Sequence, residues 1–244
     1  MTNGSDKDII SHKKLQIKIC IFANKLLYGE LLTMESKYYE QLTPDNAAML
    51  LIDHQVGTMG FGITDIDPVN LKNNALWLAE AAKVFKLPTI LTTSNPNGVN
   101  GPLFPELIEM LPEAPIIDRV IINAWNDPNF VDIVKQTGRS KLIMAGVTTD
   151  VCLAFPAIGA VKDGFDVYAV MDASGAFNQH GMFAAMFRMS QVGVKIADTV
   201  MVIAELQKDW TLATAPETGF SFAKHLPNFG YISAHMDYLA KKKG

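Results

Sequence analysis

The chain has 244 residues, of which 49% are hydrophobic and 19% charged, and its formal net charge is -4. This composition is typical of a globular protein with a sizeable core and excludes a disordered or collagen-like chain. The slight acidity gives no reason to expect nucleic acid or an anionic membrane as a partner. Two cysteines, Cys20 and Cys152, are too few for a disulfide framework, so we expect a reducing, cytoplasmic location.

The first 33 residues differ from the rest of the chain. The stretch HKKLQIKICIFANKLL has a basic start and an apolar middle, as a signal peptide has, but Lys18 and Lys25 interrupt the apolar part. No run of about 18 uncharged apolar residues predicts a membrane-spanning helix. We expect residues 1–33 to be an N-terminal extension, loosely ordered or not part of the natural protein, and residues 34–244 to form a single domain.

From Asn46 onward, candidate strands alternate with candidate helices. The apolar segments that predict strands are 47–53, 88–94, 114–120, 141–147, 166–174 and 194–200. Helices are predicted over 70–87, 104–111, 126–138, 149–164, 179–193 and 232–243. Six β-α units with short connections predict a doubly wound α/β fold with a six-stranded, mainly parallel sheet and helices on both faces.

Reactive side chains follow several of the predicted strands. Ligands of an open parallel sheet bind beyond the carboxyl ends of its strands. Asp53 follows the first strand, Arg119 the third, and the turn GVTTDVC leads from the fourth strand to Cys152. Asp172 follows the fifth strand, where we expect it to brace a turn. An acid, a cation and a thiol are therefore expected near one another.

These three groups suit nucleophilic catalysis. A thiol attacks as the thiolate, and the start of a helix lowers the pKa of a cysteine such as Cys152. Asp53 is positioned to act as the general base, and Arg119 to stabilise an anion without losing its own proton. The N–H groups of Thr148 and Cys152 are predicted to form an oxyanion hole, and Gly146 to permit close approach of the backbone.

Each of these residues also has a structural interpretation. Cys152 can be a small core residue, Asp53 a turn cap, and Arg119 one member of a surface ion pair. Trp125 fits a packed core as well as the wall of a pocket. For His54 we expect a packed or exposed structural role.

Taken together, the motifs resemble a known family. LLIDHQ, a basic residue before INAW, and GVTTDVC, in this order, are similar to the isochorismatase-like cysteine hydrolases, in particular their YcaC-type branch. Further matching stretches, among them NNALWLAEAAKVFKLPTILTTS and DASGAFN, extend the resemblance over nearly all of residues 35–243.

The resemblance implies a Rossmann-like fold and an Asp–Lys–Cys type triad, which falls on Asp53, Arg119 and Cys152. It also implies a non-proline cis peptide bond at Val147–Thr148 and a homo-oligomer, in this branch a ring-based octamer. The wider superfamily has lysine at the position of Arg119. Arginine can stabilise a negative charge but does not give up its proton, so Arg119 is not expected to act as a proton donor.

We predict a metal-independent cysteine hydrolase that cleaves the C–N bond of a small amide-like substrate through an acyl-enzyme. Gln55, Asn123 and Trp125 are predicted to line the pocket, and Gln55 to orient Asp53. The nicotinamidases of the superfamily bind a metal through aspartate and histidine, but the matching loop TTSNPNGVNGPLF contains neither, so no metal is expected. The glycine-rich dinucleotide fingerprint is absent after the first strand, so we expect no cofactor.

Two other functions stay open. One is a non-hydrolytic oligomer whose Cys152 senses oxidants. The other is vinyl ether cleavage of the isochorismatase type, which in the superfamily goes with sites that lack the nucleophilic cysteine. The sequence does not specify the substrate.

Overall fold

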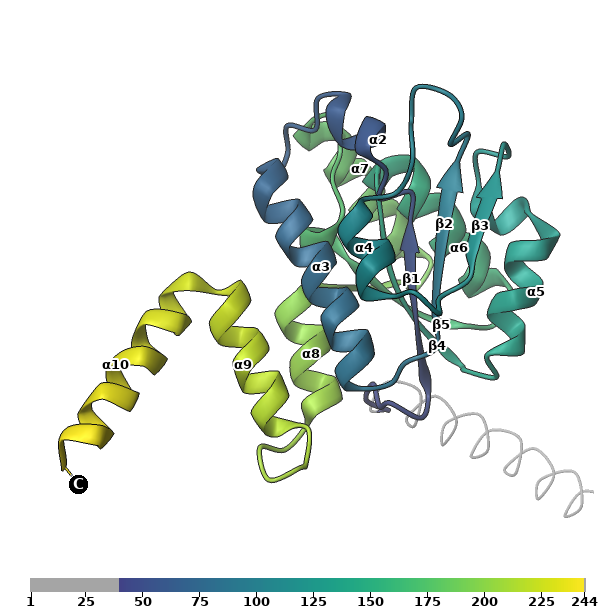
Figure 1. Ribbon diagram of the computed structural model, residues 1–244. Helices are drawn as coiled ribbons and strands as arrows, with labels where there is room; N and C mark the ends of the chain where they lie inside the picture. The colour runs from purple at the N-terminus through teal and green to yellow at the C-terminus, as the bar shows by residue number, and fades with distance from the viewer. Residues whose placement is uncertain (1–39, 244) are drawn as a thin grey trace, which may run out of the picture. The chain divides into compact units, whose positions relative to one another are not determined.

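The computed structural model describes residues 40–243 of the chain, so the predicted extension over residues 1–33 lies outside the described residues. From residue 42 onward the chain forms one compact unit. Its centre is a sheet of six parallel strands in the order β3-β2-β1-β4-β5-β6, which confirms the predicted α/β fold (Figure 1). The strands are β1 (Ala47–Ile52), β2 (Thr89–Ser94), β3 (Ile116–Arg119), β4 (Lys141–Gly146), β5 (Asp166–Val170) and β6 (Lys195–Ala197).

Helices cover both faces of the sheet. The apolar side chains of α3, α4, α8 and α9 form one core cluster against it, and those of α5, α6 and α7 form the other. In order, the helices are α2 (Val56–Gly60), α3 (Pro68–Val84), α4 (Pro105–Met110), α5 (Pro128–Gln136), α6 (Ala154–Lys162), α7 (Gln179–Gln191), α8 (Thr199–Gln207), α9 (Ala215–His225) and α10 (Pro227–Lys243). Short helical turns are η1 (Ala124–Asn126), the π-type turn η2 (Thr149–Leu153) and η3 (Met171–Ala173).

The central strand β1 explains why the sequence predicted this sheet. All six of its residues are fully buried. Side chains of a strand alternate between its faces, so Met49 and Leu51 join the cluster on one side while Leu50 and Ile52 join the other. A strand covered on both faces needs an uninterrupted apolar run rather than an alternating one.

Several predicted strands are longer than the observed ones, β5 and β6 most of all. β5 ends at Val170, because the chain turns into η3, and the hydroxyl group of Ser174 donates to the Val170 carbonyl oxygen at 2.8 Å. β6 ends at Ala197, because Asp198 caps helix α8 by accepting a hydrogen bond from the Met201 amide at 2.7 Å. In both cases a polar side chain bonds to the local backbone and ends the ladder.

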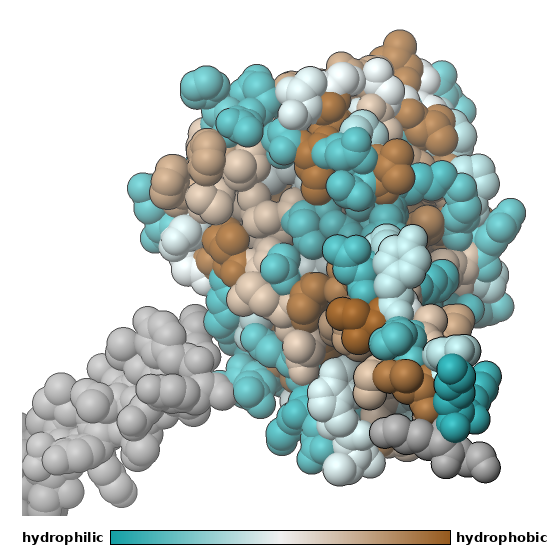
Figure 2. Space-filling view, turned by 90° about the vertical axis from the view of Figure 1, so that its left-hand side faces the viewer, coloured by the Kyte–Doolittle hydropathy of each residue, from teal (hydrophilic) through white to brown (hydrophobic). Residues whose placement is uncertain are grey.

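Helices α9 and α10 leave apolar side chains at the surface. α9 packs against the core, whereas α10 extends away from the sheet (Figure 1). Ile232, Met236 and Tyr238 of α10 are exposed, as is Phe220 of α9. Figure 2 views the molecule from this side and shows apolar groups interspersed with polar ones. Between residues 40 and 243, no helix has the length and apolar character needed to cross a membrane.

The strand order places the expected site. The strand order reverses at β1 and β4, which makes this pair of strands the switch point of the sheet. In doubly wound folds ligands bind at such a switch point, beyond the carboxyl ends of the strands. Asp53 follows β1 directly, and η2 with Cys152 follows β4.

Candidate active site

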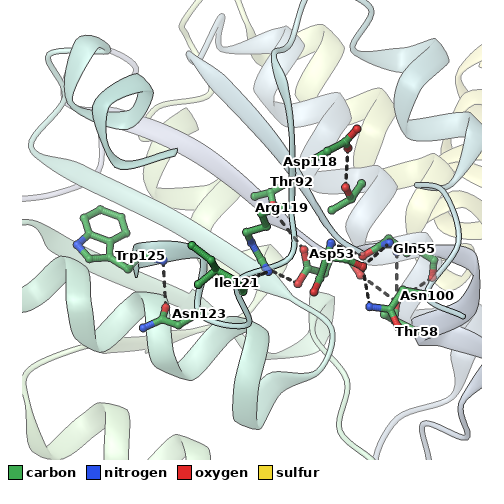
Figure 3. Close-up of polar contacts among 12 residues, drawn as sticks. Asp53, Gln55, Thr58, Thr92, Asn100, Asp118, Arg119, Ile121, Asn123 and Trp125 are labelled. Atoms are coloured by element: carbon green, nitrogen blue, oxygen red, sulfur yellow. Dashed lines mark hydrogen bonds and ion pairs between the residues drawn. The ribbon is translucent and has the colours of Figure 1, made fainter. Parts of the chain in front are cut away.

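Asp53 lies buried at the end of β1. Its backbone has a φ of 58°, in the left-handed region that non-glycine residues seldom adopt. The Asp53 amide donates to the carbonyl oxygen of Thr92 on β2 at 3.0 Å. The Thr92 hydroxyl group in turn donates to Oδ1 of Asp53 at 3.0 Å. The carboxylate is therefore held against β2 by backbone and side chain together (Figure 3).

Arg119 ends β3 and reaches across β2 to the same carboxylate. Its Nη2 atom donates to Oδ2 of Asp53 at 2.5 Å, and both side chains are completely buried. Its Nη1 atom donates to the carbonyl oxygen of Ile121 at 2.6 Å. The Nε atom is buried and has no hydrogen-bond partner within the described part of the chain. The guanidinium group thus makes a buried ion pair and is not the surface cation of the alternative interpretation.

Cys152 lies in η2, one turn before α6. The thiol lies close enough to the Asp53 carboxylate for each group to shift the pKa of the other. Close approach is possible because Gly146 ends β4: a Cβ atom at Gly146 would lie 3.1 Å from the carbonyl carbon and oxygen of Cys152. The Val147–Thr148 peptide bond just before η2 is cis, as the family resemblance implied. The three predicted triad residues therefore lie together.

The predicted lowering of the Cys152 pKa is wrong. Burial raises the pKa of this thiol well above its ordinary value, and the negative charge of Asp53 raises it further. The positive charge of Arg119 and a hydrogen bond from the Thr148 backbone oppose the rise without cancelling it. Burial also raises the pKa of Asp53, against the opposing charge of Arg119. The carboxylate and the thiol are thus a coupled pair, and the sulfur keeps its proton at rest.

The two amides predicted for the oxyanion hole differ in their surroundings. The Thr148 amide is directed at the sulfur. The Cys152 amide instead donates to the carbonyl oxygen of Thr148 at 2.7 Å. That oxygen also accepts hydrogen bonds from the amides of Val151 at 3.3 Å and Leu153 at 3.2 Å. It would therefore keep two donors if the Cys152 amide turned toward a ligand.

Gln55 does not orient the Asp53 carboxylate as predicted. Its side chain is buried and bonds elsewhere: Oε1 accepts from the Ser94 amide at 2.8 Å, and Nε2 donates to the Gly101 carbonyl oxygen at 2.5 Å. These bonds join the end of β2 to the loop that follows it. Thr92 of β2 and Arg119 of β3 hold the carboxylate instead, since each donates a hydrogen bond to one of its oxygens.

The pocket roles of Trp125 and Asn123 stay predictions, because the contacts of both residues are with the surrounding structure. The Trp125 ring packs edge-on against Phe130 and Phe165, and its Nε1 atom donates to Oδ2 of Asp163 at 3.1 Å. Oδ1 of Asn123 accepts from the Trp125 amide at 3.0 Å and caps η1. Both side chains lie away from Asp53 (Figure 3). Trp125 therefore packs in the core, which is the alternative that the sequence left open.

His54 and Asp172 have the structural roles that the sequence predicted. Nε2 of His54 lies 2.9 Å from the Ala173 carbonyl oxygen, and burial lowers the pKa of this histidine to about 4. Asp172 accepts from the amide and the hydroxyl group of Thr199 at 2.8 and 2.9 Å, which braces the start of α8.

Thr92 is the site residue that sequence reasoning missed. It lies in the middle of an apolar strand, where a threonine fits the sheet without any functional reason. Its position beside the end of β1 could have been inferred only from the strand order.

The arrangement defines a Rossmann-like α/β protein whose switch point joins a thiol, a buried carboxylate and a guanidinium group. The isochorismatase domain matches residues 47–201, so the chain belongs to the isochorismatase-like hydrolase family.

The YcaC proteins are particularly similar. The probable hydrolase YcaC of Escherichia coli is 45% identical over 214 residues, which cover 85% of this chain and 100% of YcaC. The crystal structure of E. coli YcaC, described as an octameric hydrolase of unknown specificity, matches with a TM-score of 0.80 at 46% identity and covers 82% of this chain and 98% of that one. YcaC from Pseudomonas aeruginosa, solved with hexane-2,5-diol and covalent acrylamide, matches with a TM-score of 0.79 at 45% identity, with the same coverage.

Proposed function

We propose that the protein is a cysteine hydrolase that cleaves the C–N bond of a small amide-like substrate without a metal ion. The observation that carries this proposal is that the Cys152 thiol lies beside the Asp53 carboxylate, which is buried and paired with Arg119. A thiol beside a base is the arrangement that nucleophilic catalysis requires. Covalent acrylamide in the P. aeruginosa relative supports the presence of a reactive nucleophile, because nucleophiles such as thiols add to the alkene carbon of acrylamide.

In the first half of the reaction, Sγ of Cys152 attacks the substrate carbonyl carbon while its proton passes to Asp53. The new C–S bond leaves the former carbonyl oxygen as an oxyanion. The C–N bond then breaks, the nitrogen takes the proton from Asp53, and an amine or ammonia leaves. The product is a thioester on Cys152.

In the second half, water attacks the thioester carbonyl carbon and gives a proton to Asp53. The C–S bond breaks, the acid product leaves, and the sulfur takes the proton back. The raised pKa of Cys152 fits this scheme, because the thiol need not ionise before the substrate arrives. Asp53 thus exchanges protons in turn with the sulfur, the leaving nitrogen and the attacking water.

The remaining groups stabilise the negative charges on the oxyanion and on Asp53. The Thr148 amide stabilises the oxyanion, and the Cys152 amide joins it by turning from the Thr148 carbonyl oxygen, which keeps two other donors. Arg119 keeps Asp53 ionised at rest but transfers no proton.

The experiment is a screen of small amides with three proteins: the wild type, Cys152→Ala and Asp53→Asn. We expect ammonia or amine release by the wild type alone, and an acyl adduct on the wild-type protein by intact mass spectrometry. An amide that Cys152→Ala hydrolyses as fast as the wild type does would exclude the proposed nucleophile.

The oxidant-sensing alternative receives less support from the site. Cysteines that react readily with peroxides have a low pKa and are accessible. Burial raises the pKa of Cys152 instead.

We further propose that the protein is a homo-oligomer, with an octamer as in E. coli YcaC the expected form. Ile232, Met236 and Leu239 of α10 expose apolar side chains that a subunit interface would cover. Light scattering during size exclusion would then give eight times the chain mass of 26.8 kDa. A mass of one chain would refute the assembly.

A further inference from the structure

We infer that the hydroxyl group of Thr92 is a positioning group of the active site, which fixes the Asp53 carboxylate as the base for Cys152. This inference rests on the proposed function and deepens it. It concerns Thr92, which lies in a stretch that matches the family but which the sequence did not single out as a site residue.

Thr92 contacts Asp53 through two hydrogen bonds, one from its backbone and one from its side chain. β2 lies between β1 and β3, and Thr92 pairs with Ile52, the last residue of β1. The carbonyl oxygen of Thr92 accepts from the Asp53 amide at 3.0 Å, and its hydroxyl group donates to Oδ1 at 3.0 Å. Thr92 is fully buried, so water does not replace this donor. Only the second of these contacts depends on the side chain.

The hydroxyl group completes the fixation of the carboxylate. Arg119 holds Oδ2, and Thr92 holds Oδ1. With one oxygen tied to β3 and the other to β2, the carboxylate cannot rotate about its Cβ–Cγ bond without losing a buried hydrogen bond. Rotation would also move the oxygen that receives the proton of Cys152. Without the Thr92 donor, only the ion pair with Arg119 would set the orientation.

The same bond favours the charged form of Asp53. The charged or titratable groups that face this carboxylate are Arg119 from β3 and Cys152 from η2. Burial raises the pKa of Asp53, and the hydrogen bond from Thr92 acts against that rise. Removal of the hydroxyl group should therefore raise the pKa of Asp53 further, so that the base loses its charge at a higher pH.

The next residue of β2 provides a matched control. The hydroxyl group of Thr93 also donates to a carboxylate, Oδ1 of Asp118, at 2.6 Å. Successive residues of a strand point to opposite faces, so Thr93 points away from the face on which Thr92 meets Asp53. Thr92→Val and Thr93→Val thus make the same chemical change on one strand, and only the first affects the proposed base.

The test measures alkylation of Cys152 by acrylamide, followed by mass spectrometry from pH 5 to pH 9, because this reaction needs no knowledge of the substrate. The thiol adds to the terminal alkene carbon, and a proton is delivered to the carbon beside the carbonyl. For Thr92→Val we expect a rate at neutral pH lower by on the order of tenfold, and an acidic limb moved to higher pH. Thr92→Ser, which keeps the hydroxyl group, and Thr93→Val should follow the wild type.

The outcomes separate the inference from the proposed function. If Asp53→Asn slows alkylation but Thr92→Val has the wild-type rate and pH profile, Thr92 is not a positioning residue and the hydrolase proposal stands. If Asp53→Asn alkylates as the wild type does, the proposed base is wrong. An equal shift in Thr93→Val would also overturn the inference, since it would indicate a general loosening of β2. Thr92→Ala provides the same comparison should the valine variant not fold.

Discussion

Nη2 of Arg119 and Oδ2 of Asp53 lie 2.5 Å apart, and neither side chain is exposed to solvent. The two residues end strands that are not neighbours, since β2 lies between them. In a buried ion pair, much of the attraction between the charges only offsets the free-energy cost of removing them from water. Such a pair is weak evidence for stability by itself. The charge of Arg119 favours the ionised form of Asp53 against the effect of burial, at the residue that is proposed to act as the base.

Arg119→Met should destabilise the protein by about 3–5 kcal/mol at pH 7, because it leaves Asp53 charged and unpaired in the core. Burial already raises the pKa of Asp53, and loss of the cation raises it further. A folded-state pKa above the unfolded value means that the folded state binds more protons, so stability falls as the pH rises through that window. Urea unfolding should therefore show a smaller loss at pH 5 than at pH 7.

Arg119→Lys is the control for that measurement. It keeps the positive charge but lacks the second donor that reaches the Ile121 carbonyl oxygen. We expect a smaller loss than for methionine, with little change between pH 5 and pH 7. Equal losses for both variants at both values would show that packing, and not the charge of Asp53, determines the effect.

Trp125→Phe tests whether this tryptophan stabilises the fold without affecting the reactivity of Cys152. The change removes the hydrogen bond to Asp163 and part of a ring that fills the space beside Gly159, so we expect a loss of about 2 kcal/mol in thermal or urea unfolding. Alkylation of Cys152 by acrylamide should stay at the wild-type rate. A variant of normal stability with altered Cys152 reactivity would instead support the predicted pocket role of Trp125.

Asp166→Asn tests a second buried cation, Lys141, at the opposite end of the sheet. Burial by itself raises the pKa of Asp166, but hydrogen bonds from Lys141 and Lys195 outweigh it and lower the pKa. A depressed carboxylate pKa stabilises the fold above the unfolded value, and this contribution is lost as the pH falls through the folded-state pKa.

The variant should therefore cost about 3 kcal/mol at pH 7, since the side chain of Lys141 is fully buried. Urea midpoints measured at decreasing pH should converge as the pH falls through the lowered pKa of Asp166, where the wild-type carboxyl group also becomes neutral. Curves that stay apart at that pH would mean that the asparagine disturbs packing.

Sequence patterns predicted the sheet well because burial imposes them directly. β1 needs an unbroken apolar run since both of its faces are covered. The ends of the elements were less predictable, because single polar side chains such as Ser174 and Asp198 decide them through hydrogen bonds to the local backbone. The site residues differed in the same way. Asp53 and Cys152 could be predicted because they follow recognisable strands, whereas Thr92 lies within a strand and gave no such signal.

The amino-acid sequence by itself determined that the chain is a doubly wound α/β protein and which three reactive groups end its strands, because apolar periodicity and strand-end position are local properties. Only the tertiary structure decided how those groups behave. Whether the pKa of Cys152 rises or falls, and which residues hold Asp53, depends on burial and on side chains from β2 and β3. Charges and hydrogen-bond donors act through space, so residues far apart in the chain set the chemistry of each group.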